Sequence, residues 1–212
     1  FTQISDLPDT FTVSFTGGTD ITTNQTVNRT FTNTSTRTKM ENNNGIITVN
    51  VTPITTMITE LVTNDIYDIR SVDSAISTVT NVLNITENDL EKDFIESSDA
   101  NIAKIVSQIE TTTKSLTTII NDTSVTEDSV FKTIVSQVGI KSFQGETLDF
   151  SKSSNIQDIV TQVNTSLPSS INDTVQTNAI SLISQVNNNL EKIVQNTSKT
   201  INTTMTELVQ LT

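Results

Sequence analysis

The chain has 212 residues, a formal net charge of −12 and apolar residues at 33% of its positions. It contains no Cys, His or Trp, which excludes Cys/His zinc sites, thiol nucleophiles and Ser-His-Asp triads. The twelve Lys and Arg residues are scattered, which disfavours binding to nucleic acid or anionic lipid, and no apolar run is long enough to span a membrane.

Residues 1–52 are predicted to form a small antiparallel β region. Phe11, Val13 and Phe15 alternate with Thr and Ser, and a second alternating stretch covers residues 27–40. Alternation of apolar and polar side chains is typical of a strand with one buried face.

An Asn-rich turn signal at residues 42–45 precedes a third alternating stretch at residues 47–51. The expected sheet has Val, Phe and Ile on one face and solvated hydroxyl groups on the other. Such a small sheet needs a cover to be stable.

From Pro53 onward the apolar period changes to three or four residues, which indicates amphipathic helices. We expect one helix over Ile54–Leu83. A second begins at the capping box of Thr86 and Asp89 and continues to Ile120, and a shorter one starts at Thr126 and ends near Gly139. The expected domains are 1–52 (β-rich), 53–139 (helical hairpin or bundle), 140–154 (irregular connector) and 155–212 (helical stalk).

The last helix is expected to start at Ser170, where a second capping pattern places Asp173 three residues later, and to continue towards Thr212. Its apolar residues step by 4, 4 and 3, which is an eleven-residue repeat. This period favours straight or right-handed bundling of helices. We predict that the repeat forms an oligomer seam, the alternative being ordinary packing within one chain. The apolar seam residues are Ile171, Val175, Ala179, Leu182, Val186, Leu190, Ile193, Ile201 and Leu208.

The segment from Ile171 to Leu208, with its Asn- and Thr-rich exterior, resembles the stalks of archaeal surface-layer glycoproteins. It covers about a fifth of the chain and does not include the β region. The resemblance implies a parallel, right-handed stalk of several helices that carries glycans.

Ten Asn-x-Ser/Thr tripeptides provide acceptor sites for N-glycans. They begin at Asn24, Asn28, Asn33, Asn50, Asn84, Asn121, Asn164, Asn172, Asn196 and Asn202. Their number, and a surface rich in Thr, Ser and Asn, favour an extracytoplasmic location. The alternative is that the tripeptides follow by chance from a Thr- and Asn-rich composition.

The first residue is Phe1 rather than Met, which favours either removal of a signal peptide or a fragment of a longer protein. The acidic residues between Glu87 and Asp99 could recruit Ca²⁺, but a solvated helix face is the preferred interpretation because no loop glycine is present.

Together these features predict an α+β structural protein of a cell, extracellular or virion surface: a homo-oligomeric stalk, fibre or surface-layer subunit. We expect no enzyme activity, catalytic residue, cofactor, metal, nucleic acid or membrane insertion by these residues. Other surface or virion proteins are possible partners. The alternative function is a viral or phage ectodomain for entry, fusion or receptor binding, built on a helical bundle.

Overall fold

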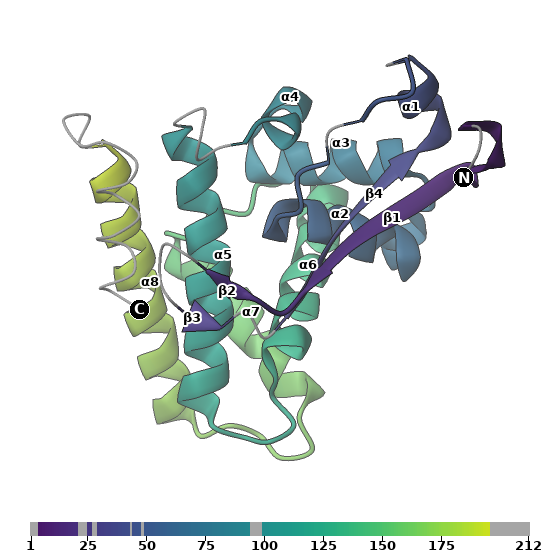
Figure 1. Ribbon diagram of the computed structural model, residues 1–212. Coiled ribbons are helices and arrows are strands. Elements are labelled where there is room, and N and C mark those ends of the chain that lie inside the picture. The colour runs from purple at the N-terminus through teal and green to yellow at the C-terminus, as the bar shows by residue number, and fades with distance from the viewer. Residues whose placement is uncertain are drawn as a thin grey trace.

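The computed structural model describes residues 4–20, 25–26, 29–42, 44–47, 49–93 and 99–195 (Figure 1). Within these residues the fold is α+β, as expected, with eight α-helices and two short antiparallel strand pairs. The strands are β1 (Thr10–Thr16), β2 (Thr19–Asp20), β3 (Gln25–Thr26) and β4 (Thr30–Thr36). The helices are α1 (Arg37–Asn42), α2 (Pro53–Thr63), α3 (Val72–Leu83), α4 (Glu87–Glu91), α5 (Ala100–Ile120), α6 (Glu127–Gln144), α7 (Ser153–Ser166) and α8 (Asp173–Gln195), with 3₁₀ turns η1 (Ile4–Asp6) and η2 (Ile66–Asp68).

The N-terminal β region is a two-stranded ribbon of β1 and β4, in which Phe15 lies opposite Phe31. The second alternating stretch is a strand only over Thr30–Thr36 and then turns into α1. The expected third strand at residues 47–51 is wrong: its described residues form no strand. Instead, the Asn33 side chain donates a hydrogen bond to the main-chain oxygen of Asn50 at 2.6 Å.

Threonines of α2 occupy the edge of β4 that a third strand would need. The Thr32 N–H donates to Thr56 Oγ1 at 2.9 Å, and Thr55 Oγ1 donates to the Thr32 carbonyl at 3.0 Å. Hydroxyl groups therefore satisfy the outer main-chain groups of β4, as an edge in a packed structure requires.

The predicted assignment of the ribbon's two faces is wrong in two respects. On the hydroxyl face, Thr34 Oγ1 contacts Thr59 Oγ1 of α2 at 3.1 Å rather than solvent alone. On the apolar face, Val13 and Phe15 remain 40% and 50% exposed. Alternation along the strand is correct, but it does not reveal which face the helices cover.

The helix predicted over Ile54–Leu83 is two helices. α2 ends at Thr63 with Asn64 as its C-cap, and Asp65, Tyr67 and Asp68 then adopt positive φ, which a continuous helix cannot contain. α3 starts afresh after Ser71, whose side chain accepts a hydrogen bond from the Ser74 N–H.

The helix predicted from Thr86 to Ile120 is also interrupted. The capping box of Thr86 and Asp89 is confirmed, but α4 ends at Glu91 and Lys92 is extended. α5 has its own N-cap at Asp99, which accepts hydrogen bonds from two main-chain N–H groups of the first turn.

α6 starts at Thr126 as predicted but continues past Gly139 to Gln144, where Gly145 ends it at a φ of 69°. Part of the expected connector 140–154 is therefore helical. α8 begins at Asp173 rather than at Ser170, and the Asn172 side chain accepts a hydrogen bond from the Thr174 N–H.

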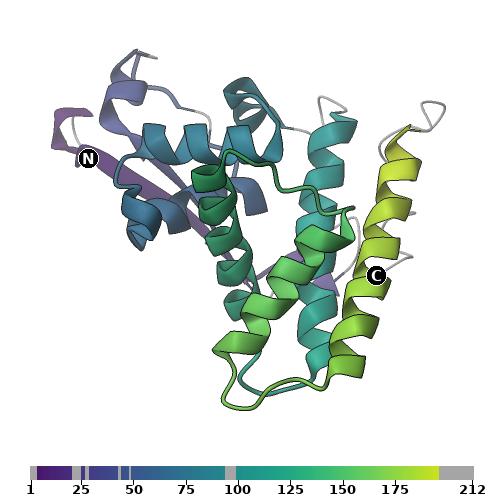
Figure 2. The same cartoon turned by 180° about the vertical axis from the view of Figure 1, so that it is seen from behind.

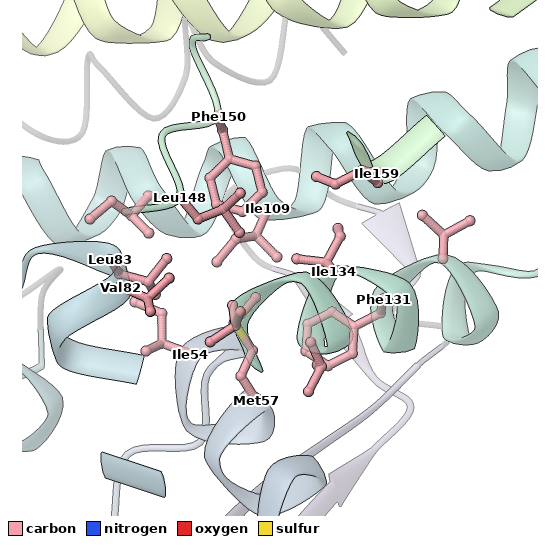
Figure 3. Packing of buried hydrophobic residues seen from close by; sticks show 14 of the residues in the cluster. Ile54, Met57, Val82, Leu83, Ile109, Phe131, Ile134, Leu148, Phe150 and Ile159 are labelled. Atoms are coloured by element: carbon pink, nitrogen blue, oxygen red, sulfur yellow. The ribbon is translucent and has the colours of Figure 1, made fainter. Parts of the chain in front are cut away.

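The helices pack around one hydrophobic cluster that contains buried residues from Ile54 to Ile183. Figure 2 shows α5 and α8 side by side, with α6 and α7 against them. The connector between α6 and α7 enters this core: Leu148 and Phe150 point towards Ile109 in Figure 3. The Leu148 N–H donates to the Val82 carbonyl at 2.9 Å, which ties the connector to α3.

None of the described helices is both long enough and apolar enough to cross a membrane.

Candidate functional site

The apolar stripe predicted as an oligomer seam divides into two parts on α8. Ala179 and Leu190 are fully buried within the chain, where α8 packs against α5 and α7, whereas Leu182 is 51% exposed. The half-buried members of the stripe are Ile171, Val175, Val186 and Ile193. Ile201 and Leu208 lie outside the described residues. The described stripe thus follows the border between the packed face of α8 and solvent.

The packed face of α8 contains a polar residue, Asn187, that the apolar pattern did not identify. Its side-chain Nδ2 donates to Thr112 Oγ1 and to the Phe150 carbonyl, both at 3.0 Å, while Gln108 donates to its main-chain oxygen at 3.1 Å. Asn187 is fully buried and joins α8 to α5 and to the connector before α7. Hydropathy assigns Asn to a solvated face, so no sequence signal distinguishes this residue.

Three acceptor asparagines are exposed at the ends of helices. Asn84 follows α3 and Asn121 follows α5, both with the left-handed φ that Asn tolerates well at a helix end. Asn172 precedes α8 and is also exposed. All three positions are accessible to an enzyme that attaches a glycan.

Three other acceptor asparagines, Asn33, Asn50 and Asn164, are half-buried. Asn33 uses its amide nitrogen, the atom to which an N-glycan is attached, for the hydrogen bond to Asn50 described above. In Asn164 it is the side-chain oxygen that accepts a hydrogen bond, from the Ile171 N–H at 2.6 Å. The remaining acceptors, Asn24, Asn28, Asn196 and Asn202, lie outside the described residues.

A pocket of about 570 Å³ with a mixed polar and apolar lining lies between β4, α1, α2, α3 and α4. Asn33 and Asn50 line it, together with an ion pair in which Lys39 Nζ lies 2.5 Å from Glu91 Oε1. A second pocket of about 500 Å³ lies beside α5 and α8, where Lys104 pairs with Glu191 at 3.0 Å. Each pocket therefore contains one ion pair, and further acidic residues line both: Asp73 and Glu87 in the first and Asp149 in the second.

Among the described residues, no group of three or more Asp or Glu side chains is arranged to hold a metal ion. In the predicted acidic cluster, Asp89 and Asp99 cap helices and Glu91 pairs with Lys39. The hydrogen bonds from Thr86 hold the pKa of Asp89 below its usual range.

A buried ion pair joins the ribbon to the helices. Arg29, which immediately precedes β4, is 5% exposed and pairs with Glu110 of α5. The Arg29 guanidinium carbon also lies 3.9 Å from the centre of the Phe131 ring and 4.7 Å from that of Phe31. Among the described residues, Nε and Nη1 of this guanidinium have no hydrogen-bond acceptor, and the two aromatic rings stabilise its charge by cation–π contact.

Burial dominates the electrostatics of this pair. It raises the pKa of the Glu110 carboxyl, which Arg29 and Lys114 only partly offset, and it lowers the pKa of Arg29. The two residues are 81 positions apart, and no sequence pattern connects them.

Comparison of the chain with protein-family models, with curated proteins and with solved structures finds no match.

Proposed function

We propose that this protein is an extracytoplasmic structural subunit of a surface assembly, a glycoprotein that associates with copies of itself. The observation that carries the proposal is the exposure of Asn84, Asn121 and Asn172 at helix ends. A glycan at a helix end projects away from the packed faces, so these three sites can be modified without disturbing the core.

The left-handed cap geometry is by itself a sufficient reason for Asn at positions 84 and 121. It does not require the Thr that completes each acceptor tripeptide, Thr86 and Thr123. In the tripeptide that begins at Asn84, Thr86 is required for a second reason, because it is the N-cap of α4. Asn121 and Asn172 are therefore the more informative sites.

The proposed architecture for assembly is a helical bundle with an outward stripe on α8. α8 packs against α5 and α7 on one side. Leu182 and the half-buried residues of the stripe beside it therefore remain accessible to a neighbouring copy. As on the surface-layer stalks that the segment resembles, a glycan at Asn172 would lie beside such a contact. Enzyme activity is not part of this function.

Glycopeptide mapping of the protein isolated from its natural source tests the proposal. We expect the peptides that contain Asn121 and Asn172 to carry glycan mass, and surface proteolysis of intact cells or particles to release fragments of the chain. Recovery of both peptides in unmodified form, from a protein that surface proteolysis does not reach, would contradict it.

A further inference from the structure

Among the described residues, no strand or helix pairs with the outer edge of β1. Six of the seven residues of this strand are exposed and Phe11 is half-buried. Within the described residues, β4 is the one strand that pairs with β1. The opposite edge of the ribbon differs, because threonines of α2 cover β4. Figure 1 shows β1 crossing in front of the helices.

The main-chain groups at this open edge can be identified from the pairing on the other side. In an antiparallel ladder the N–H and C=O of alternate residues point to opposite edges. Thr32 directs its main-chain groups away from β1 to α2, and it lies opposite Ser14. Consequently Ser14, and with it Thr10, Thr12 and Thr16, directs its N–H and C=O groups to the open edge.

Natural monomers protect such an edge with charged residues, proline or a bulge. β1 has none of these: its sequence is Thr-Phe-Thr-Val-Ser-Phe-Thr, without a charge, in a chain whose net charge is −12. The two apolar side chains Val13 and Phe15 are also exposed.

The strand sequence is nearly the same in both directions, with Val13 at its centre. Two antiparallel copies related by a two-fold axis at Val13 would place Phe11 opposite Phe15, Thr12 opposite Ser14 and Thr10 opposite Thr16. Aromatic side chains then meet aromatic ones on one face and hydroxyls meet hydroxyls on the other, and both kinds of cross-strand pair are stabilising. β1 and β4 already use the second kind, since the hydroxyls of Thr12 and Thr34 lie 2.8 Å apart.

We propose that β1 pairs with β1 of a second copy of this chain, antiparallel and centred on Val13, to form a four-stranded sheet. The pairing satisfies the open main-chain groups of both strands and covers Val13 and Phe15. Asp9, which forms an ion pair with Arg37, falls opposite Gly17 of the second copy, so no like charges meet across the strands. This contact uses a different surface from the stripe on α8, and the two can be tested separately.

Single-cysteine variants test the register, because the chain has no cysteine of its own. At the axis, the two Val13 residues form a non-hydrogen-bonded pair with their Cα atoms about 4.5 Å apart, close enough for a disulfide. Upon mild oxidation we expect Val13→Cys to form a covalent dimer at least about tenfold faster than two controls. Thr12→Cys lies on the same strand but off the axis, and Phe143→Cys is 87% exposed at the end of α6. Equal rates for the three variants, or a faster Thr12→Cys, would overturn the proposed pairing.

A charge at the axis provides a test without cross-linking. Val13→Lys places two ammonium groups opposite each other, and we expect the dimer Kd measured by sedimentation to rise at least about tenfold. Phe143→Lys, which makes the same charge change elsewhere, should leave the Kd unchanged. Circular dichroism checks that Val13→Lys, at an exposed position, retains the fold. An unchanged dimer in Val13→Lys, or a wild-type chain that is monomeric at every concentration, would overturn the inference.

The outcomes separate this inference from the proposed function. If Leu182→Lys abolishes self-association while Val13→Lys does not, the β1 contact is wrong and an assembly through α8 stands. If Val13→Cys cross-links as expected but the native protein carries no glycan, the β1 contact stands and the proposed function is wrong.

Discussion

At the scale of single residues, buried polar side chains hold the parts of this protein together. Arg29 joins the ribbon to α5, and Asn187 joins α8 to α5 and to the connector before α7. Because burial removes these groups from water, each depends on its partners inside the protein. Their removal should therefore be costly even though they are not hydrophobic.

We expect Asn187→Ala to lower the free energy of unfolding by about 2–3 kcal/mol, because the Phe150 carbonyl and the Thr112 hydroxyl lose a buried donor and a small cavity forms. Denaturant unfolding measures the change. The control is Asn189→Ala two residues later, on the exposed side of α8, which should change the stability by less than about 0.5 kcal/mol. Equal effects of the two substitutions would contradict the assigned role of Asn187.

Burial of the Glu110 carboxyl should make the protein less stable as the pH rises, the reverse of the usual effect of a carboxyl group in a salt bridge. Since burial raises its pKa in the folded state, the folded protein binds this proton more tightly than the unfolded chain does. The stability that it contributes is fully present below the ordinary pKa of Glu. That contribution is lost as the pH rises through the raised value.

Comparison of unfolding free energies in steps from pH 4 to pH 8 tests this sign. Glu110→Gln, which cannot ionise, should remove the decline attributed to Glu110. Glu87→Gln, at an exposed position, should leave the decline in place. The explanation would be wrong if the wild-type and Glu110→Gln curves had the same shape.

At the scale of helices and strands, the capping residues Thr86 and Thr126 locate helix starts correctly, whereas the pattern at Ser170 places the start of α8 three residues too early. Thr86 with Asp89, and Thr126, mark true helix starts, because a cap satisfies main-chain donors locally. Apolar periodicity continued across the break at residues 64–71, since α2 and α3 both face the same core. The break itself was present in the sequence as Asn64-Asp65 and as the N-cap Ser71.

The role of the ribbon could not be predicted in the same way. Alternation identified β1 and β4, but the absence of a third strand depends on hydroxyl groups of α2 that are distant in sequence. Likewise, the stripe on α8 was recognised as apolar, but only the packing of α5 and α7 determines that Leu190 is buried and Leu182 is not.

Because the Tyr67 ring lies close to Gly139, we expect that α6 does not tolerate a larger side chain at position 139. A Cβ added to Gly139 would lie 2.7 Å from Cε2 of the Tyr67 ring, whose backbone already has a positive φ of 55°. Gly139→Ala should therefore destabilise the protein by about 1 kcal/mol, although Gly→Ala inside a helix normally stabilises by about that amount.

A double-mutant cycle by thermal unfolding isolates this contact. In a Tyr67→Ala background the ring contacts are gone and Ile66 Cγ2 remains at 3.3 Å, so Gly139→Ala should become stabilising by up to about 1 kcal/mol. A gain of stability from Gly139→Ala in the wild-type background would contradict the close approach of Tyr67.

At the scale of the whole molecule, the ribbon and α8 lie at opposite sides (Figures 1 and 2). A chain that associates through β1 on one side and through the α8 stripe on the other would join copies into an extended series rather than a closed dimer. Two such contacts are compatible with a fibre or a surface layer.

The net charge of the chain should make the proposed self-association depend on salt. Each copy has a net charge of −12, so association brings like charges together. Increasing NaCl from about 0.02 M to about 0.5 M shortens the screening length severalfold and should strengthen self-association. Sedimentation velocity across this range measures the effect, and weaker association at high salt would indicate a contact dominated by opposite charges.

Self-assembly of the chain is tested by its molar mass in solution, measured by light scattering. At concentrations from about 1 to 100 μM, a range that detects association of ordinary affinity, we predict a mass that rises to at least twice the 23.2 kDa of one chain. A mass of 23.2 kDa at every concentration, at both low and high salt, would show that the chain does not self-assemble.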